Sequence, residues 1–235
     1  MKTVSPSHAS AIFVGFTAYF FFLLSTLYPF LAANVAWNPV LNWFVTGYAL
    51  FIPISAYAVL AVRNEGHDTI PSILAGLGIR PMCARDWKFA LAGLAITFAL
   101  TGLIFGASSA LSDLFGVREM STEPWFVSLS PLQGAERLLL LVWLPMFFFN
   151  IVGEEILWRG YIQRRITSRH GWLVCACLWW IFHLPFGPDL LIMLLPITIV
   201  VPYVFHRTQS TLACVFIHGV YNGPLFVVIA LGAMA

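Results

Sequence analysis

The sequence predicts an all-α membrane protein, a polytopic bundle of about seven transmembrane helices within a range of six to eight. Hydrophobic residues make up 60% of the 235 residues and charged residues only 9%, whereas a soluble domain carries about 25% charged residues. Apolar segments follow one another along the chain, and Lys and Arg gather in alternate connections between them. The net charge of +2 is small and no basic stripe is present, which argues against a nucleic-acid partner.

Seven apolar segments account for most of the chain. They run over residues 11–33, 41–62, 88–111, 137–160, 171–186, 188–205 and 210–233. All but the fifth are long enough to cross about 30 Å of hydrocarbon at 1.5 Å per residue. The fifth is short and ends near Pro185, so we expect a tilted or incomplete crossing there. With no repeat and no second domain, we treat residues 1–235 as one membrane domain.

Two partly apolar stretches lie outside these segments. Residues 70–79 (IPSILAGLGI) are expected to connect two spans or to lie along the cytoplasmic membrane surface. Residues 122–133 contain Pro124, Trp125 and Pro131, and we expect an outer-face loop or lid there.

The distribution of basic residues predicts the orientation. The N-terminus and the second, fourth and sixth connections carry Lys2, Arg63, Arg80, Arg85, Lys88, Arg164, Arg165, Arg169 and Arg207. The remaining connections are poor in Lys and Arg, and residues 112–136 hold one Arg against four acids. Because cytoplasmic connections carry the excess of Lys and Arg, we expect a cytoplasmic N-terminus. The side of the C-terminus depends on whether the number of spans is odd.

The polar residues inside the segments fall into pairs four residues apart. These pairs are Asn150 with Glu154, Glu155 with Arg159, and His218 with Asn222, and the fifth segment adds His183. Residues at i and i+4 share one face of a helix. Counted from the predicted cytoplasmic ends, Glu154, His183 and His218 lie roughly 15, 18 and 14 Å into the membrane at 1.5 Å per residue. Polar groups at one depth are tolerated if they face one another, so we expect a conical polar cavity inside the membrane.

This set of residues suits hydrolysis of an amide bond. A carboxylate beside a histidine can hold a water molecule and take its proton, and an Asn with a second His can donate hydrogen bonds to the oxygen of a tetrahedral intermediate. Glu155 and Arg159 can form an ion pair that orients Glu154. The sequence contains neither GxSxG nor HExxH, and the chemistry requires no serine or cysteine nucleophile.

Three motifs in order resemble those of the CPBP family, the CAAX-protease and bacteriocin-processing group that is also called Abi. The motifs are EExxxR (Glu154 to Arg159), an aromatic residue four positions before a histidine (Trp179 to His183), and HxxxN (His218 to Asn222). The resemblance covers mainly residues 145–225, within a motif-bearing core of about 137–225. It implies a glutamic intramembrane endopeptidase whose substrate is a membrane-bound peptide or protein tail.

The resemblance also implies roles for individual residues. Glu154 and His183 would activate the water, and His218 and Asn222 would form the oxyanion site. Glu155 and Arg159 would support this geometry, together with Asn150. One departure concerns Trp179, because the family usually has Phe at that position, and this change is expected to alter the shape of the pocket.

Several alternatives remain open at this level. We favour hydrolysis without a metal or other cofactor, but Glu154, His183 and His218 could instead bind zinc. The substrate could be prenylated, a bacteriocin or a C-terminal sorting anchor. The compact size fits a bacterial member of the family, and we therefore expect the cytoplasmic (inner) membrane. A non-catalytic scaffold or bacteriocin-immunity protein is the first alternative function, and a proton-coupled transporter is the second.

Overall fold

Helices form all the regular structure of the chain in residues 2–127 and 130–232, which the computed structural model describes. The α-helices are α1 (Pro6–Phe22), α2 (Tyr28–Asn34), α3 (Pro39–Arg63), α4 (Ile70–Gly76), α5 (Ala84–Phe115), α6 (Leu139–Glu155), α7 (Gly171–Phe182), α8 (Pro188–Met193), α9 (Leu195–Thr208) and α10 (Thr211–Ala230). The π-helices are η1 (Leu23–Leu27) and η3 (Ile156–Gln163), and the 3₁₀-helices are η2 (Gly134–Leu138) and η4 (Leu184–Phe186).

Six of the seven predicted segments form helices long and apolar enough to cross a membrane. These helical stretches are Pro6–Asn34, Pro39–Arg63, Ala84–Phe115, Gly134–Gln163, Pro188–Thr208 and Thr211–Ala230. The remaining stretch, Gly171–Phe186, is shorter, as the sequence predicted for the fifth segment. The prediction of an all-α bundle is therefore confirmed. The last predicted segment reaches residue 233, which lies outside the described residues.

Helix starts follow capping signals in the sequence. Ser5 and Asn38 each precede a proline, and their side chains accept hydrogen bonds from the backbone N–H groups of His8 and Val40. Such side chains satisfy N–H groups that have no partner within the helix, and proline suits the first helical turn because it lacks an N–H. The sixth segment breaks at Leu194 into α8 and α9, since Pro196 cannot donate to the preceding turn.

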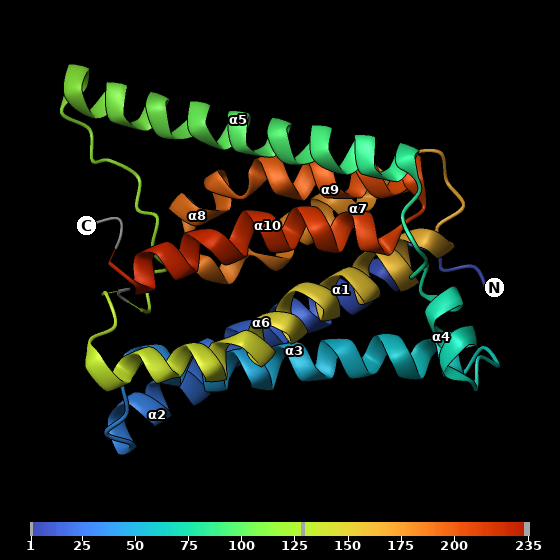
Figure 1. The fold of residues 1–235 in the computed structure, drawn as a ribbon, viewed down its shortest axis with the longest axis horizontal. Coiled ribbons are helices and arrows are strands. Elements are labelled where there is room, and N and C mark those ends of the chain that lie inside the picture. The colour runs from blue at the N-terminus through green and yellow to red at the C-terminus, as the bar shows by residue number, and fades with distance from the viewer. Residues whose placement is uncertain (1, 128–129, 233–235) are drawn as a thin grey trace.

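The connections predicted to share one side of the membrane contact one another. The backbone N–H of Val4 donates to the carbonyl oxygen of Arg165 at 3.1 Å, and Nη1 of Arg164 donates to that of Ala75 at 2.8 Å. At the same end of the bundle, Nη2 of Arg85 donates to the carbonyl oxygen of Arg207 at 3.1 Å. The N-terminus and α4 lie together at this end (Figure 1), which we call the N-terminal end. The basic connections thus gather on one side.

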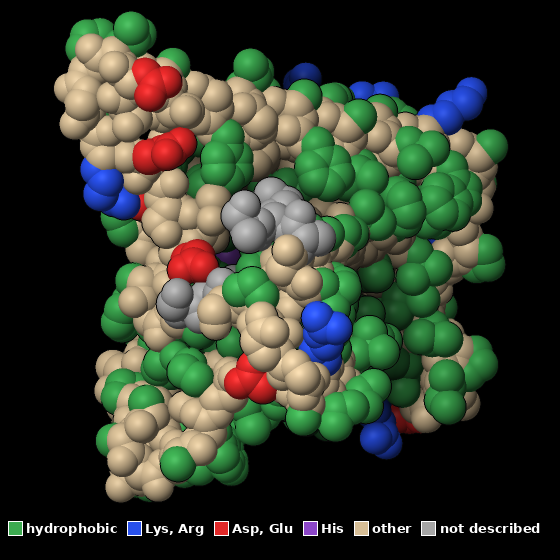
Figure 2. All heavy atoms as spheres, turned by 60° about the vertical axis from the view of Figure 1, so that its left-hand side comes forward, with side chains coloured by type: hydrophobic (Ala, Val, Ile, Leu, Met, Phe, Trp, Pro, Cys, Tyr) green, Lys and Arg blue, Asp and Glu red, His purple; other side chains and the backbone are tan. Residues whose placement is uncertain are grey.

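Helix α5 lies along the outside of the bundle against α9 and α10, and α3 packs along α6 (Figure 1). The 32 residues of α5 extend about 48 Å at 1.5 Å per residue. Large apolar side chains on α5, such as Leu103 and Leu114, are 68% and 75% exposed. Hydrophobic side chains are spread over the face in Figure 2, and charged ones are few. Such a surface suits a lipid environment.

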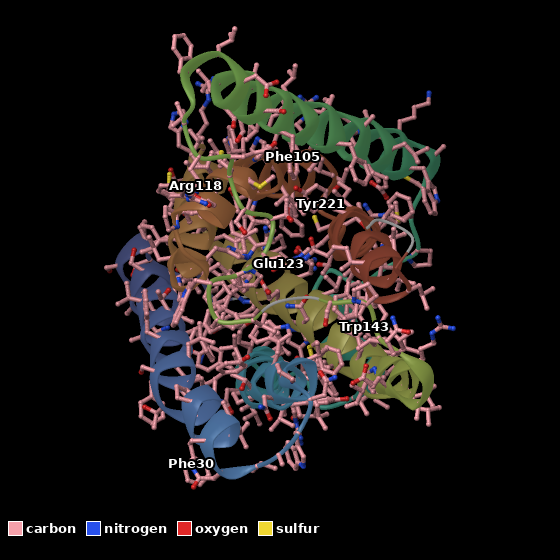
Figure 3. The ribbon with its side chains drawn as sticks, turned by 90° about the vertical axis from the view of Figure 1, so that its left-hand side faces the viewer. Phe30, Phe105, Arg118, Glu123, Trp143 and Tyr221 are labelled. Atoms are coloured by element: carbon pink, nitrogen blue, oxygen red, sulfur yellow. The ribbon has the colours of Figure 1, made fainter. Side chains whose placement is uncertain are left out.

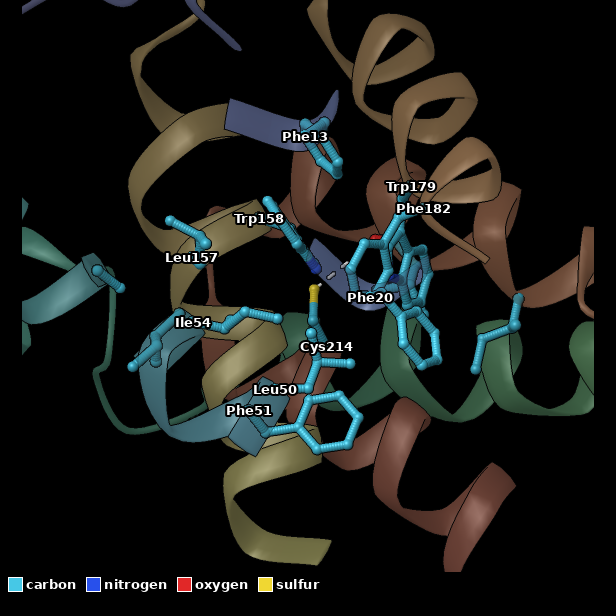
Figure 4. Close-up of a cluster of buried hydrophobic side chains, with 14 of the residues drawn as sticks. Phe13, Phe20, Leu50, Phe51, Ile54, Leu157, Trp158, Trp179, Phe182 and Cys214 are labelled. Atoms are coloured by element: carbon cyan, nitrogen blue, oxygen red, sulfur yellow. Dashed lines mark hydrogen bonds between the residues drawn. The ribbon is translucent and has the colours of Figure 1, made fainter. Parts of the chain in front are cut away.

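Buried aromatic side chains fill the interior between the first helix and the helices that carry the polar motifs (Figure 4). Phe13 of α1 stacks on Trp158 of η3 with ring centroids 4.0 Å apart, and Phe20 packs against Phe182 of α7 at 5.7 Å. All four side chains are at most 1% exposed. Helix α1 therefore supports the wall from which the polar motifs project.

The connection from α5 to η2 crosses the opposite end of the bundle, as expected for a loop or lid over residues 122–133, of which residues 128–129 lie outside the described part. Glu123 of this connection lies near the middle of that end in Figure 3. Arg118 and Asp189 form an ion pair at 2.7 Å, and Nε1 of Trp125 donates to the carbonyl oxygen of Pro185 at 2.8 Å. These contacts fix the connection to Pro185, which precedes α8, and to Asp189 in the first turn of α8.

Candidate active site

The two neighbouring carboxylates lie at the end of α6, where the α-helix changes to the π-helix η3. Glu154 is 2% exposed and Glu155 is fully buried. Glycines on either side let other segments approach closely: a Cβ on Gly153 would collide with Oγ of Ser55 on α3, and one on Gly160 would lie 2.5 Å from the carbonyl oxygen of Leu77. Short π-helical segments occur frequently at functional sites, and this one directly follows the acids.

The carboxylate of Glu154 accepts hydrogen bonds from three N–H donors. Nδ2 of Asn150 donates to Oε1 at 3.1 Å. The indole nitrogens of Trp158 and Trp179 both donate to Oε2, at 3.3 and 2.7 Å. The predicted proximity of Asn150 and Glu154 is thus present. A buried carboxylate is tolerated when donors of this kind stabilise its charge.

Glu155 contacts a different set of groups. Its Oε1 accepts a hydrogen bond from Nδ1 of His218 at 2.8 Å, and its Oε2 lies 3.3 Å from Nε of Arg159. The ion pair predicted between Glu155 and Arg159 is therefore present. Whether this pair orients Glu154, as expected from the sequence, stays a prediction; the contacts of Glu155 are with His218 and Arg159. Helix α10 packs against α6 and brings His218 to the end of α6, where Glu155 lies.

His183 ends α7, where its own backbone turns out of the helix. Its Nδ1 lies 2.7 Å from the carbonyl oxygen of Trp179. A carbonyl only accepts hydrogen bonds, so Nδ1 carries the proton and Nε2 of the neutral ring keeps its lone pair. Nε2 of both His183 and His218 has no hydrogen-bond partner among the described residues. Each histidine thus has one nitrogen fixed and the other available.

A cavity of about 220 Å³ collects the predicted catalytic residues. Glu154, His183, His218 and Asn222 all line it, as do Asn150 and Trp179. Glu155 and Arg159 do not line it and lie behind the wall. Most of the remaining lining is aromatic or aliphatic, so the cavity is less polar than the sequence analysis expected. The three helices that carry the motifs therefore meet at one point, as the depth count predicted.

The stretch expected to form an outer-face loop or lid contributes to the cavity. Thr122 and Pro124 of this connection between α5 and η2 line it, although they were not named as site residues from the sequence. Trp158 was not named as a site residue from the sequence, and it donates a hydrogen bond to Glu154. Its spacing of four residues from Glu154 is the signal that could have identified this contact.

The zinc alternative requires three ligands around one point. Among the described residues, no three His, Cys, Asp or Glu side chains are placed to hold one metal ion. Nε2 of each histidine has no protein partner and is a nitrogen through which an imidazole can bind zinc, while Nδ1 is held by a carbonyl or a carboxylate. Zinc therefore stays the alternative to metal-free hydrolysis.

These features define a class: a polytopic helical membrane protein with a buried carboxylate–histidine cavity at the meeting point of three apolar helices. One family model matches part of the chain. The model of Rce1-like proteins, described as type II CAAX prenyl endopeptidase Rce1-like, matches residues 136–223. This match confirms the family that the three motifs indicated, and residues 136–223 include all the motif positions. Comparisons with curated proteins and with solved structures give no match.

The match supports a CAAX-type intramembrane protease that acts on peptide bonds, at the level of the family, and the six apolar helices indicate an integral membrane protein. The matched region begins at η2 and extends into α10, so it contains every helix that lines the cavity with a motif residue. Helices α1, α3 and α5 lie outside the match and pack around that region.

Proposed function

We propose that this chain is a glutamic intramembrane endopeptidase that hydrolyses a peptide bond in a membrane-associated peptide or protein tail. The observation that carries the proposal is the single cavity lined by Glu154, His183, His218 and Asn222. Four polar groups on three helices, inside a mostly apolar cavity, form a set that suits water activation and stabilisation of an oxyanion.

Glu154 and His183 are the groups that would activate the water. His183 has a lone pair on Nε2, because its Nδ1 proton is held by the carbonyl of Trp179. A water molecule held between this nitrogen and the Glu154 carboxylate can attack the carbonyl carbon of the scissile bond and transfer a proton to Glu154. That proton then passes to the leaving amine as the C–N bond breaks. No step of this mechanism passes through a metal ion.

His218 and Asn222 would bind the oxyanion of the tetrahedral intermediate. Asn222 has an amide N–H₂ group for this purpose. His218 donates through Nε2 only when its ring carries both protons, since Nδ1–H is directed at Glu155. The carboxylate of Glu155 can neutralise the positive charge of that imidazolium. Each donor to an oxyanion is worth about 10²–10³ in turnover in well-studied enzymes.

The proposal also includes a location. We place the protein in the cytoplasmic membrane of a bacterium with its N-terminus in the cytoplasm. The basic connections gather at the N-terminal end of the bundle, as shown by the contacts of Arg164 and Arg85 with neighbouring connections. Lys and Arg are enriched on the cytoplasmic side of membrane proteins.

The decisive experiment compares membrane peptides in the native host that expresses either the wild type or Glu154→Gln at matched levels. Gln has nearly the same shape, and rotation of the Asn150 amide can present its oxygen to the new N–H₂ group, so the variant is expected to fold. We expect specific membrane peptides to keep an uncleaved terminus in the variant, because loss of a general base lowers turnover by about 10²–10⁴ or more.

The matched control is Glu119→Gln, which removes the same charge from an exposed position outside the cavity. Peptide termini in that strain should match those of the wild type. Identical termini in the wild-type and Glu154→Gln strains would refute the proposed activity.

A further inference from the structure

Trp179 contacts four charged or titratable groups of the candidate site. Its indole N–H donates to Glu154 at 2.7 Å, and its ring lies 3.5 Å from the guanidinium carbon of Arg159. Its ring edge or face meets the rings of His183 and His218, each at a centroid distance of 5.3 Å. The side chain is fully buried. Trp179 therefore lies at the centre of the site.

The hydrogen bonds to Glu154 leave its two oxygens in different states. A carboxylate oxygen offers about two lone-pair positions. Those of Oε2 are both taken, by Trp158 and Trp179, while Oε1 accepts only from Asn150. One lone-pair position therefore remains, on Oε1. A water molecule that binds this carboxylate must bind there.

The geometry points to Trp179 as a positioning residue that fixes which oxygen of Glu154 holds the attacking water. This inference rests on the proposed endopeptidase function and adds a role that water activation by Glu154 and His183 does not itself require. Without the indole N–H, the second lone pair of Oε2 becomes available, and the water can bind in a position that does not face His183.

The backbone of the same residue positions the second group that would hold the water. The Trp179 carbonyl accepts the Nδ1 proton of His183, so its position fixes the lone pair on Nε2. One residue therefore positions Glu154 through its side chain and His183 through its main chain. A substitution of Trp179 removes the hydrogen bond from its indole to Glu154 and leaves the hydrogen bond between its carbonyl oxygen and His183.

Phenylalanine, which the family usually has at this position, separates the hydrogen bond from the aromatic packing, so the test concerns a donor that distinguishes this chain. Trp179→Phe keeps an aromatic face for Arg159 and loses only the N–H donor and part of the ring. The matched control is Trp180→Phe. The indole of Trp180 also donates one hydrogen bond, to the carbonyl oxygen of Leu191 at 2.8 Å, but Trp180 does not line the cavity. Both variants therefore replace Trp by Phe, at two adjacent positions.

The test measures kcat and KM in purified protein with the membrane peptide whose terminus changes in the Glu154→Gln strain. We expect kcat of Trp179→Phe to fall about 10- to 100-fold, the usual effect of one hydrogen bond to a charged group. KM should stay within about threefold, because a misplaced water slows the chemical step and leaves substrate binding intact. Trp180→Phe should stay within about threefold in both constants.

A second variant guards against misfolding of Trp179→Phe. β-(3-Benzothienyl)alanine at position 179 keeps the size of the indole and replaces N–H by sulfur, and it should show the same loss of kcat. The hydrogen bond itself can be followed without activity: the indole ¹⁵N–¹H signal of Trp179 should move in Glu154→Gln, and that of Trp180 should not.

The outcomes separate the two proposals. If the wild type cleaves and Glu154→Gln does not, the endopeptidase stands, and a Trp179→Phe enzyme as fast as Trp180→Phe overturns the positioning role alone. An unmoved Trp179 signal in Glu154→Gln also overturns it. If the wild type and Glu154→Gln leave identical termini in the host, the endopeptidase fails, and the positioning role fails with it.

Discussion

Arg165 pairs with Glu65 at the N-terminal end of the bundle, and Arg159 pairs with Glu155 behind the cavity. Both arginine side chains are fully buried and both glutamates are at most 5% exposed. The pairs therefore have the same composition and similar burial. They differ in how completely their polar atoms are hydrogen-bonded. We infer that this difference separates a structural pair from one that belongs to the proposed active site.

The Arg165 guanidinium has a partner for each nitrogen. Nε and Nη2 donate to the two oxygens of Glu65 at 2.8 and 2.9 Å. Nη1 donates to the carbonyl oxygens of Gly160 and Tyr161 at 3.1 and 3.0 Å, and Nη2 also reaches that of Gly76. This bidentate geometry is the strong form of such a pair. Through these contacts the Arg165 side chain joins the end of α3, the end of α4 and the end of η3.

The Arg159 guanidinium lacks such partners. None of its three nitrogens has an aligned hydrogen-bond acceptor among the described residues, and Oε2 of Glu155 likewise has no aligned donor. The guanidinium instead stacks on Trp179. Buried polar groups in proteins are nearly always hydrogen-bonded, and exceptions occur at sites of function. We infer that the Arg159 region is shaped by the chemistry proposed for the cavity and the Arg165 region by folding.

Arg165→Met should give the largest effect on stability. It leaves the buried Glu65 carboxylate and three carbonyl groups without their donors, and breaking such a pair typically costs about 3–5 kcal/mol. We expect a much lower unfolding temperature in detergent, measured by a thermal shift, with turnover per folded molecule close to that of the wild type.

The control for Arg165→Met is Arg169→Met, which removes the same charge from an exposed side chain nearby. Its unfolding temperature should stay near the wild-type value. If Arg165→Met abolished turnover in the molecules that remain folded, the division between a structural and a functional pair would be wrong.

Glu155→Gln and Glu65→Gln make the same chemical change in the two regions. Glu155→Gln removes the charge that would neutralise a protonated His218, so turnover per folded molecule should fall about 10- to 100-fold. It should also lower stability, because Arg159 loses its counter-charge. Glu65→Gln should lower stability alone, with turnover per folded molecule within about twofold. Equal turnover in the two variants would contradict the comparison.

The fold was predictable because its signals are local. Apolar length predicted the spans, and a short fifth segment predicted a short helix α7. The clustering of basic residues predicted which connections lie together, as the contact of Arg85 with Arg207 bears out. Spacing of four residues predicted the pairing of Asn150 with Glu154 and of Glu155 with Arg159.

Contacts between distant segments were not predictable in the same way. The hydrogen bond from His218 to Glu155 joins residues 63 positions apart, and it depends on the rotation of α10 about its own axis, which no local pattern fixes. The same is true of the Trp179 indole, which lies 25 positions from Glu154. Depth in the membrane predicted that the helices meet, whereas helix rotation decides which acid meets which base.

The pH dependence of stability gives the smallest expected effect and tests the structural pair alone. Burial of the Glu65 carboxyl raises its pKa, but the hydrogen bonds and the charge of Arg165 together outweigh burial, so its pKa lies below the ordinary value of 4.5. A carboxyl with a lowered pKa in the folded state adds stability above the unfolded-state pKa. That stability is lost as the pH falls through the folded-state value.

The measurement compares unfolding temperatures of the wild type and Glu65→Gln from pH 7 down to about pH 3. The wild type should be more stable by a few degrees above about pH 4.5, and the two curves should converge below it. Other acids titrate equally in both proteins, so the difference between the curves isolates Glu65. If the difference in unfolding temperature between the two proteins stayed constant to the lowest pH, Glu65 would stabilise the bundle as a neutral hydrogen-bond acceptor and not as the charged partner of Arg165. The contrast between Glu65 and Glu155 would then rest on hydrogen-bond geometry alone.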